Sequence, residues 1–309
     1  MKKDKFTVSI GIPVYNEKEG IENLLDSIIR QDANNFNLDS IFVLCDGTND
    51  GTDTIVEKLA KKDSNIRLIN DRKRKGKIER LKEIFRLNVS DIILVLDGDM
   101  VLGRPDVITE IVNYFKKNEA AIVSANNQPV ESETFTGKMF NYWSYIWYLA
   151  RLRFNDGDNV HNIRGCSMAI SREFARKINF PPKVNSYARY MYFFCQQQRR
   201  EFYFAKNALV LYRKPDNLQE YIVQISRASP DKDKLEEIFG SWIKEKYKVP
   251  VKYKLLALFD SFFHNPLLFV SSALFNFVTS KYTYKDVRSK NSTIWETAPS
   301  TKKRITVPF

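Results

Sequence analysis

The first hundred residues of this chain alternate between short apolar runs and helical patterns, and this alternation limits the possible folds more than any other feature of the sequence. Residues 6–14 (FTVSIGIPV) are apolar on both alternating sets, which is typical of a strand buried on both faces. In residues 19–31, apolar side chains recur at spacings of three and four and predict a helix. Further strands are predicted over 40–45, over 65–70 and within 91–100, and further helices over 53–62 and 77–87. This alternation predicts an α/β fold with a doubly wound, mostly parallel sheet.

Polar clusters follow three of the predicted strands. They are YNE at 15–17, CDGTND at 45–50 and DGD at 97–99. In doubly wound sheets, ligands bind beyond the carboxyl ends of the strands. We therefore expect the three clusters to meet in one crevice.

Two of these segments have the composition of an ion or phosphate site. Asp97 and Asp99 flank a glycine at the tip of a buried strand, which suits a hard divalent cation that also takes phosphate oxygens, although such a triplet is also common in surface turns. Five cations surround Gly76, at the start of the helix predicted from Lys77. This basic turn could bind an anion at the helix N-terminus, or it could simply be solvated. The five cations are Lys73, Arg74, Lys75, Lys77 and Arg80.

The second half of the chain is less regular. Strands are predicted over 120–128, 163–170 and 201–212, and helices over 137–154, 186–198 and 218–227. A highly charged segment at 230–252 marks a boundary. We expect one domain over 1–228, with halves 1–104 and 105–228, then a charged linker and apolar helices over 229–285, and a basic, flexible tail over 286–309.

The long apolar segment near the C-terminus is broken rather than continuous. Residues 261–280 contain no Asp, Glu, Lys or Arg, but Pro266 divides them into pieces shorter than the roughly 20 residues of a spanning helix. Lysines and tyrosines flank the segment at 252–254 and 281–285. The pattern favours a peripheral, interfacial hairpin on a membrane, with a buried or dimer-forming helix pair and a true span as alternatives.

Charge and cysteine content restrict the partners and the compartment. Lys and Arg total 49 against 37 Asp and Glu, so the formal net charge is +12, which favours an anionic partner such as an anionic membrane surface. The three cysteines fit neither a zinc site nor a disulfide framework, and the N-terminal segment lacks an apolar secretory core. These features predict a cytoplasmic location, peripheral at the cytoplasmic face of the membrane.

The motifs of residues 6–228 together resemble the family-2 glycosyltransferases. The segments VSIGIPVYNE, CDGTNDGT, RKGKIERLKEIF and LVLDGDM match the nucleotide-sugar half of that family in order and spacing, and NIRGCSMAISRE is similar to its acceptor-side strand and turn. The resemblance implies a GT-A fold, a nucleotide-diphosphate sugar donor, with UDP favoured, and Mg²⁺ or Mn²⁺. It implies that Pro13, Tyr15, Glu17, Asp46, Lys77, Arg80 and Asp97 bind the donor, that Asp99 and Asp97 bind the metal, and that Arg164, Gly165, Gln224 and Arg227 lie on the acceptor or diphosphate side.

The chain departs from the family at the position of the general base. The family's usual catalytic Asp falls in register with Ala188 and Arg189, and neither side chain accepts a proton at neutral pH. The base could come from elsewhere, with Asp156, Asp158, His161 or Glu173 as candidates, or the protein could have lost transfer activity. Alternatively, the acceptor could be a phosphate that is already ionised, in which case Arg189, Arg199 and Arg200 would contact it. Ala228 replaces a second motif residue, a Trp.

Taken together, the sequence predicts a metal-dependent, inverting glycosyltransferase that acts on a lipid-linked or polysaccharide acceptor. A donor-binding homologue without transfer activity is one alternative. A basic membrane-binding or nucleic-acid-binding module is another, but the chain matches no nucleic-acid module, so no nucleic acid is expected as a partner. Nucleotidyl transfer would need a Gly-rich loop at the first strand, which GIPVYNE lacks.

Overall fold

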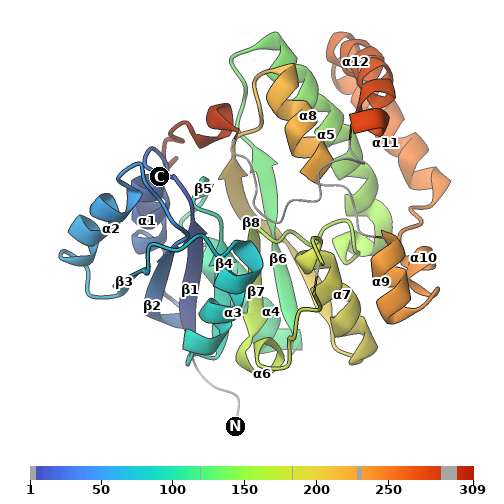
Figure 1. The fold of residues 1–309 in the computed structure, drawn as a ribbon. Helices are drawn as coiled ribbons and strands as arrows, with labels where there is room; N and C mark the ends of the chain where they lie inside the picture. Colours follow the sequence, from blue (N-terminus) through green and yellow to red (C-terminus); the bar gives the residue numbers. More distant parts are fainter. Residues whose placement is uncertain (1–4, 119, 183, 228–231, 287–297) are drawn as a thin grey trace.

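A computed structural model describes residues 5–118, 120–182, 184–227, 232–286 and 298–309, and Figure 1 shows its fold. The strands are β1 (Phe6–Val14), β2 (Phe36–Cys45), β3 (Ile66–Asn70), β4 (Ile92–Leu96), β5 (Met100–Leu102), β6 (Ile122–Pro129), β7 (Ser167–Ser171) and β8 (Phe202–Tyr212). The helices are α1 (Ile21–Ile29), α2 (Thr52–Ala60), α3 (Lys77–Leu87), α4 (Val107–Asn118), α5 (Phe135–Arg153), α6 (Arg172–Ala175), α7 (Tyr187–Gln197), α8 (Leu218–Arg227), α9 (Lys232–Phe239), α10 (Ile243–Lys246), α11 (Val251–His264) and α12 (Pro266–Asp286).

The strands form one sheet in the order β3-β2-β1-β4-β7-β6-β8-β5. β1, β2, β3 and β4 are parallel, as the βαβ alternation predicts. β6 and β8 are also parallel, whereas β7 runs antiparallel to both β4 and β6, and β5 runs antiparallel to β8. The expected α/β architecture and mostly parallel sheet are therefore confirmed, with β7 and β5 as the two strands that run antiparallel to their neighbours.

Helices cover both faces of the sheet, and each face has its own apolar core (Figure 1). One core joins the strands to α1, α2 and α4, and includes Leu24, Val56 and Ile111. The other joins them to α3, α6, α7 and α9, and includes Ile84 and Phe193. Because both faces are covered, the central strands carry apolar side chains on both sets, which explains the unbroken apolar runs of the sequence.

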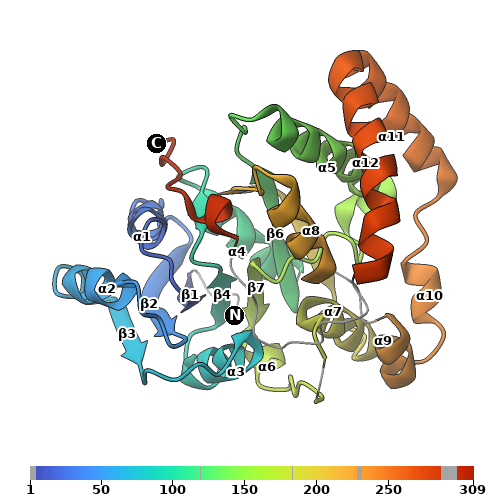
Figure 2. The ribbon, with the colours of Figure 1, turned by 45° about the horizontal axis from the view of Figure 1, so that its top comes forward.

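The apolar segment near the C-terminus forms two helices, α11 and α12, separated at Asn265 and Pro266. Both helices pack on α5, beside which they lie in Figure 2. Ala257 and Ser261 are buried, and Tyr142 donates a hydrogen bond to the carbonyl oxygen of Ser261 at 2.5 Å. In the described part of the chain, no helix has both the length and the apolar character needed to cross a membrane.

The sequence predicts a flexible tail over 286–309, but the last twelve residues are packed on the rest of the protein. Residues 287–297 lie outside the described residues, but residues 298–309 pack against the body of the protein. Pro299–Lys302 form a turn of 3₁₀ helix, and Ala298, Thr301 and Ile305 are buried. Apolar and hydroxyl side chains on either side of the basic residues 302–304 provide this packing, which net composition does not indicate.

Candidate active site

A cavity of 960 Å³ lies where β1, β2 and β4 end, at the carboxyl edge of the parallel half of the sheet. Its volume is at the upper end of the range of ligand pockets, roughly 300–1,000 Å³. The three polar clusters of the sequence therefore reach one cavity. Its lining includes Pro13, Tyr15, Glu17, Asp46, Lys77, Asp97 and Asp99 from the first half, Arg164, Gly165, Ala188, Arg189 and Gln224 from the second half, and Thr301 and Lys302 from the C-terminus.

Three carboxylates crowd together at the tips of β1 and β4. The turn after β4 approaches Glu17 so closely that a Cβ atom on Gly98 would lie 2.7 Å from the Cγ atom of Glu17, so only glycine fits there. Burial, with the nearby Asp99 charge, raises the pKa of Glu17 to about 8, and burial with the Asp97 charge raises the pKa of Asp99 to about 6. Asp97 is ion-paired with Lys77, the first residue of α3.

The residues of this carboxylate cluster suit a divalent cation. The Oε2 atom of Glu17 is buried without a hydrogen-bond partner, and the charges of Asp99 and Asp97 disfavour ionisation of Glu17, which a bound cation would relieve. Within the described ranges, no three His, Cys, Asp or Glu side chains are arranged to hold a metal ion by themselves. Asp97 and Asp99 therefore fit Mg²⁺ or Mn²⁺ only where a ligand such as a diphosphate and water complete the coordination.

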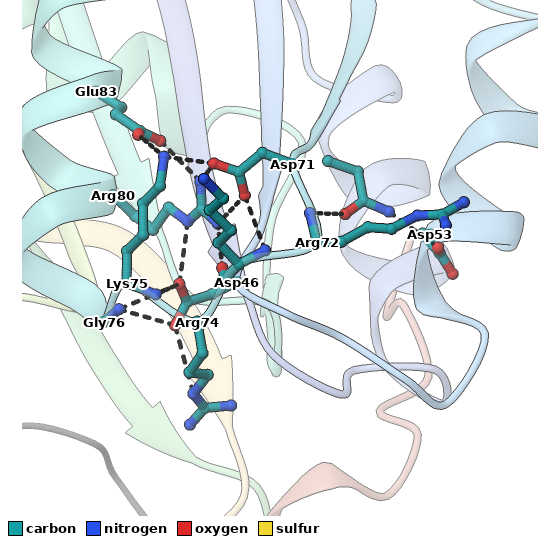
Figure 3. Close-up of polar contacts among 11 residues, drawn as sticks. Asp46, Asp53, Asp71, Arg72, Arg74, Lys75, Gly76, Arg80 and Glu83 are labelled. Atoms are coloured by element: carbon teal, nitrogen blue, oxygen red, sulfur yellow. Dashed lines mark hydrogen bonds and ion pairs between the residues drawn. The ribbon is translucent and has the colours of Figure 1, made fainter.

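Asp46 lies at the centre of a hydrogen-bond network that orders the basic loop, shown in Figure 3. Its carboxylate accepts from the backbone nitrogen of Lys75 at 2.7 Å, from that of Gly76 at 3.1 Å and from Arg80 Nε at 3.0 Å. Lys75 and Gly76 immediately precede α3, so the carboxylate also compensates the positive end of this helix. The oxygens of Asp46 are thus engaged by the protein itself.

Arg80 is the fully buried partner in this network. Its guanidinium donates to Asp46, to Asp71 at 2.8 Å, to Glu83 at 2.8 Å and to the carbonyl oxygen of Lys73 at 2.7 Å. All of its hydrogen-bonding directions face protein groups. Although the resemblance implies that Arg80 contacts the nucleotide, its geometry is that of a residue that positions Asp46 and the loop.

The aromatic ring of Tyr15 lies beneath a cation. The guanidinium carbon of Arg74 is 3.0 Å from the ring centroid, and Arg74 also pairs with Asp46 at 3.5 Å. Lys302, close to the end of the chain, donates to the carbonyl oxygen of Tyr15 at 2.6 Å. The loop after β1 is therefore held from both sides by cations.

The opposite part of the cavity carries positive charge. Arg151 on α5, Arg164 before β7 and Lys214 after β8 have no carboxylate within ion-pair distance among the residues the structure describes. The Nε atom of Arg151 is buried without a hydrogen-bond partner. Burial, with the charges of Arg164 and Arg151, lowers the pKa of Lys214 to about 7, and burial with Arg164 lowers the pKa of Arg151 to about 9. We call these three residues the cation cluster.

The turn at Gly165 explains how Arg164 reaches this position. The ring of Tyr187, from the start of α7, lies against the Gly165 backbone, and any Cβ atom there would clash with the Tyr187 hydroxyl. The Arg164 backbone nitrogen donates to Ser124 Oγ at 3.0 Å. Tyr187 and Ser124 thus fix the backbone on both sides of the Arg164 side chain.

Other residues singled out in the sequence are not at the cavity. Asp156 pairs with Lys206, Asp158 accepts from the Phe204 backbone at 2.6 Å, and Glu173 pairs with Lys177 and Arg200. His161 contacts the carbonyl oxygen of Tyr247 at 3.1 Å.

Neither Arg199 nor Arg200 lines the cavity, which does not support their expected contact with an acceptor phosphate. The side chain of Arg227 and the whole of Ala228 lie outside the described part of the chain.

Ala188 and Arg189, at the positions where the sequence resemblance predicts the family's base, do line the cavity, and Arg189 Nη1 donates to Ser186 Oγ at 3.4 Å. Five carboxylates line the described part of the cavity: Glu17, Asp97 and Asp99 of the carboxylate cluster, Asp46, and Glu131. The side chain of Glu131 is 86% exposed. No buried carboxylate in the described lining lies on the side of the cation cluster.

Sequence reasoning missed Arg151, Lys214, Glu131 and Lys302 as lining residues. Arg151 falls within an aromatic helical pattern, and Lys214 follows a strand without a motif. The sequence identifies Arg74 as one of five cations around Gly76 but does not predict its contact with Tyr15. The signal that identifies these residues is burial of a charged side chain, which appears only once the chain is folded.

A family model described as glycosyl transferase family 2 matches residues 9–178. Two curated relatives are an uncharacterized glycosyltransferase of Haemophilus influenzae, 30% identical over 36% of this chain, and a dolichyl-phosphate β-glucosyltransferase of Trichomonas vaginalis, 28% identical over 60% of this chain. The matches span 33% and 63% of those relatives' lengths.

Among solved structures, a mannosyltransferase of Pyrobaculum calidifontis in complex with GDP-Man and Mn²⁺ aligns with 87% of this chain and 74% of its own. The TM-score is 0.59 and the sequence identity is 17%. At this identity the likeness concerns the fold, and it agrees with the GT-A architecture expected from the sequence.

Proposed function

Because the chain belongs to glycosyl transferase family 2, we propose that it transfers a hexosyl group from a nucleotide-diphosphate sugar to a lipid-linked phosphate. The observation that carries this proposal is the division of one cavity between a carboxylate cluster and a cation cluster. Carboxylates suit the cation that accompanies a diphosphate donor, and unpaired cations suit a second anion.

On the donor side, we propose that Pro13, Tyr15 and Glu17 line the base and ribose, and that Lys77 and Asp97 face the diphosphate end. Arg80 and Asp46 shape this surface from behind, since their polar atoms are engaged with one another. Asp97 and Asp99 would hold a divalent cation, which would supply Lewis-acid neutralisation of the leaving diphosphate when bound. The Mn²⁺ in the Pyrobaculum mannosyltransferase supports this metal dependence. We favour a UDP-sugar, as the sequence resemblance implies.

On the acceptor side, a phosphate explains both the cation cluster and the lack of a buried carboxylate beside it in the described lining. A phosphate oxygen attacks C1 of the sugar as the bond from C1 to the diphosphate oxygen breaks, and the electron pair leaves with the nucleoside diphosphate. No proton has to be removed, because the nucleophile is already ionised. A direct displacement of this kind inverts the anomeric centre. The dolichyl-phosphate glucosyltransferase among the relatives supports an acceptor of this class.

The second candidate is a protein that binds the donor without transferring the sugar. The observation that favours it is that Ala188 and Arg189, the positions that the sequence resemblance predicts for the family's base, line the cavity. Release of nucleoside diphosphate on addition of acceptor separates the two functions.

We further propose that α11 and α12 bring the cavity to a membrane surface, at the cytoplasmic face. Their outward side chains include Leu255, Phe259, Phe263 and Leu267, each more than 60% exposed, and basic residues Lys252 and Lys254 lie at the start of α11. Apolar exposure of this extent, next to lysines, suits the interface of an anionic bilayer, where a lipid-linked acceptor resides.

The test begins with calorimetric titration of UDP-glucose and GDP-mannose, with and without Mn²⁺. Transfer to a short polyprenyl phosphate is then compared with transfer to a neutral saccharide. We expect Mn²⁺-dependent donor binding and transfer to the phosphate only. Arg164→Met should abolish transfer, whereas Arg176→Met, at an exposed site outside the cavity, should not affect it.

Absence of binding to either nucleotide sugar would overturn the proposed function. Transfer to the neutral saccharide at an equal rate would overturn the choice of acceptor. Donor binding without nucleoside diphosphate release on any acceptor would favour the second candidate.

A further inference from the structure

The C-terminal residues 298–309, which we call the strap, cross the rim of the cavity. On one side they are fastened to the segment that links β8 to α8 and to the first turn of α8. Ser300 donates from its backbone nitrogen to Glu220 Oε2 at 3.1 Å, and the Asp216 backbone donates to Ser300 Oγ at 3.1 Å. Arg213 donates to two strap carbonyl oxygens, at 3.2 and 3.1 Å.

On the other side, the strap is fastened to α1. Asn23 donates to the carbonyl oxygen of Ile305, which is buried, and Arg30 donates to the carbonyl oxygen of Phe309 at 3.2 Å. Figure 2 shows the red C-terminal segment passing from the neighbourhood of α8 toward α1. The strap therefore connects the two halves of the chain over the end of the sheet.

Between these two attachments, Lys302 points into the site. Its ammonium group donates to the carbonyl oxygens of Tyr15 at 2.6 Å and of Asn16, and to Glu17 Oε1 at 2.8 Å. All three donors of the ammonium are thus used on three consecutive residues of the loop after β1. Asn16 has a positive φ of 54°, a conformation that needs support from neighbouring groups.

We propose that the docked strap forms a wall of the donor site, and that Lys302 is a positioning residue that holds the Tyr15–Glu17 loop in its donor-binding shape. The inference rests on the proposed function, because it concerns the same site. Lys302 lines the cavity without filling it, since 960 Å³ remains open beside it. Its side chain is 18% exposed, whereas that of the neighbouring Lys303 is 57% exposed. Lys302 therefore belongs to the site and Lys303 to the surface.

Loss of Lys302 removes three hydrogen bonds from the loop and leaves the buried Glu17 carboxyl without its cationic partner. The loop then no longer presents Tyr15 and Glu17 in one conformation, so donor affinity should fall. By thermodynamic linkage, a donor that binds more tightly when the strap is docked must in turn stabilise the docked strap.

The experiment measures binding of UDP-glucose or GDP-mannose, whichever the wild-type protein binds, together with proteolysis of the strap. Lys302→Met should raise the Kd about tenfold or more, within the usual range of coupling between sites. Lys302→Arg should recover part of the affinity because it keeps the charge. The matched control Lys303→Met should bind as the wild type does. In the wild type, the nucleotide sugar should slow cleavage within 298–309.

Thermal unfolding of each variant separates positioning from folding, because a strap that only adds stability would lower the melting temperature of Lys302→Met without changing the Kd. That result would overturn the proposal, and so would faster cleavage of the strap when nucleotide sugar is added, which would identify the strap as a plug. If the wild-type protein binds neither nucleotide sugar, the proposed function fails and this inference fails with it. If the wild type binds and Lys302→Met binds equally well, only this inference fails.

Discussion

At the scale of single residues, Arg80 shows how a charged side chain stabilises the site without contacting a ligand. It is fully buried and joins Asp46, Asp71 and Glu83, which come from three different segments of the chain (Figure 3). Burial by itself would lower the pKa of Arg80, but hydrogen bonds to these carboxylates raise it above its usual value. The guanidinium is therefore charged at every pH at which the protein folds.

Arg80→Met should reduce the free energy of unfolding by about 3 kcal/mol, because removal of this fully buried guanidinium leaves the buried Asp46 carboxylate with only the more distant cation of Arg74. Arg86→Met, at an exposed position of the same helix, should change it by less than about 0.5 kcal/mol. Urea unfolding followed by circular dichroism measures both. Equal stability of the two variants would show that the network contributes nothing.

The sequence indicated a basic cluster around Gly76 but not which of its cations would be buried. Glu83 lies one turn from Arg80 along α3, so this pair can be expected from helical spacing. Asp46 and Asp71 reach Arg80 only because β2 and β3 end next to α3 in the folded sheet. The partners of a buried charge depend on tertiary neighbours, which a charge run does not specify.

The pKa of Lys214 gives a residue-scale prediction for acceptor binding. Burial, with Arg164 and Arg151 beside it, lowers this pKa to about 7, and its other neighbours, Ser144 Oγ and the Phe140 carbonyl oxygen, carry no charge. The charged form, which attracts a phosphate, is therefore lost as the pH rises above about 7. A phosphate monoester is already a dianion over that range.

We expect the affinity for a short polyprenyl phosphate to fall by up to about fiftyfold between roughly pH 7 and pH 9, since the charged fraction of a lysine with a pKa of about 7 falls from about one half to about one hundredth. Lys214→Arg should remove most of this dependence, because the guanidinium keeps its proton. Calorimetric titration at several pH values measures the effect. A flat profile for the wild type would exclude Lys214 from the acceptor site.

At the scale of elements, the apolar pattern identified most strands and helices but not strand direction. β7 is buried on both faces as β1 is, yet it runs antiparallel to β4 and β6. A buried strand has the same apolar pattern in either direction, so only the connections between elements determine whether it runs parallel or antiparallel. The helix α4 and the short strand β5 were not predicted, and β5 is only three residues long, which gives no periodicity to detect.

The outward face of α11 and α12 yields a prediction at this scale. Phe259 and Phe263 are 62% and 67% exposed, and their ring centroids are 4.6 Å apart. Replacing both with glutamate should leave the free energy of unfolding within about 1 kcal/mol of wild type, because neither supports the core. The same change should abolish sedimentation with phosphatidylcholine–phosphatidylglycerol vesicles.

Ile29→Glu is the matched control, since Ile29 is an exposed apolar residue on α1. It should sediment with vesicles as the wild-type protein does. If the phenylalanine double variant still sediments, α11 and α12 do not form the membrane-binding face.

At the scale of the whole molecule, the site is assembled from segments that are far apart in the sequence. The carboxyl-terminal ends of β1, β2 and β4 could be predicted to converge, because parallel strands place these ends along one edge. The cation cluster and the strap could not, since Arg151, Lys214 and Lys302 lie in segments without a motif. The pair between Lys302 and Glu17 joins residues 285 positions apart, and nothing local in either segment indicates it.

The net charge of +12 adds an electrostatic contribution to membrane binding, beside the contribution of the apolar side chains. The salt dependence of binding distinguishes the two contributions. Electrostatic attraction to an anionic bilayer is screened when salt rises from about 0.1 M to about 1 M, because the Debye length shrinks from about 10 Å to about 3 Å. Burial of the phenylalanines of α11 in the interface is not screened in this way. The fraction of protein that sediments with anionic vesicles should therefore fall as salt rises, down to a residual level. The fraction that sediments with neutral phosphatidylcholine vesicles should equal this residual level at any salt concentration. The double variant Phe259→Glu with Phe263→Glu should lose the residual binding. If the wild-type protein instead lost all binding at high salt, charge alone would hold it on the membrane.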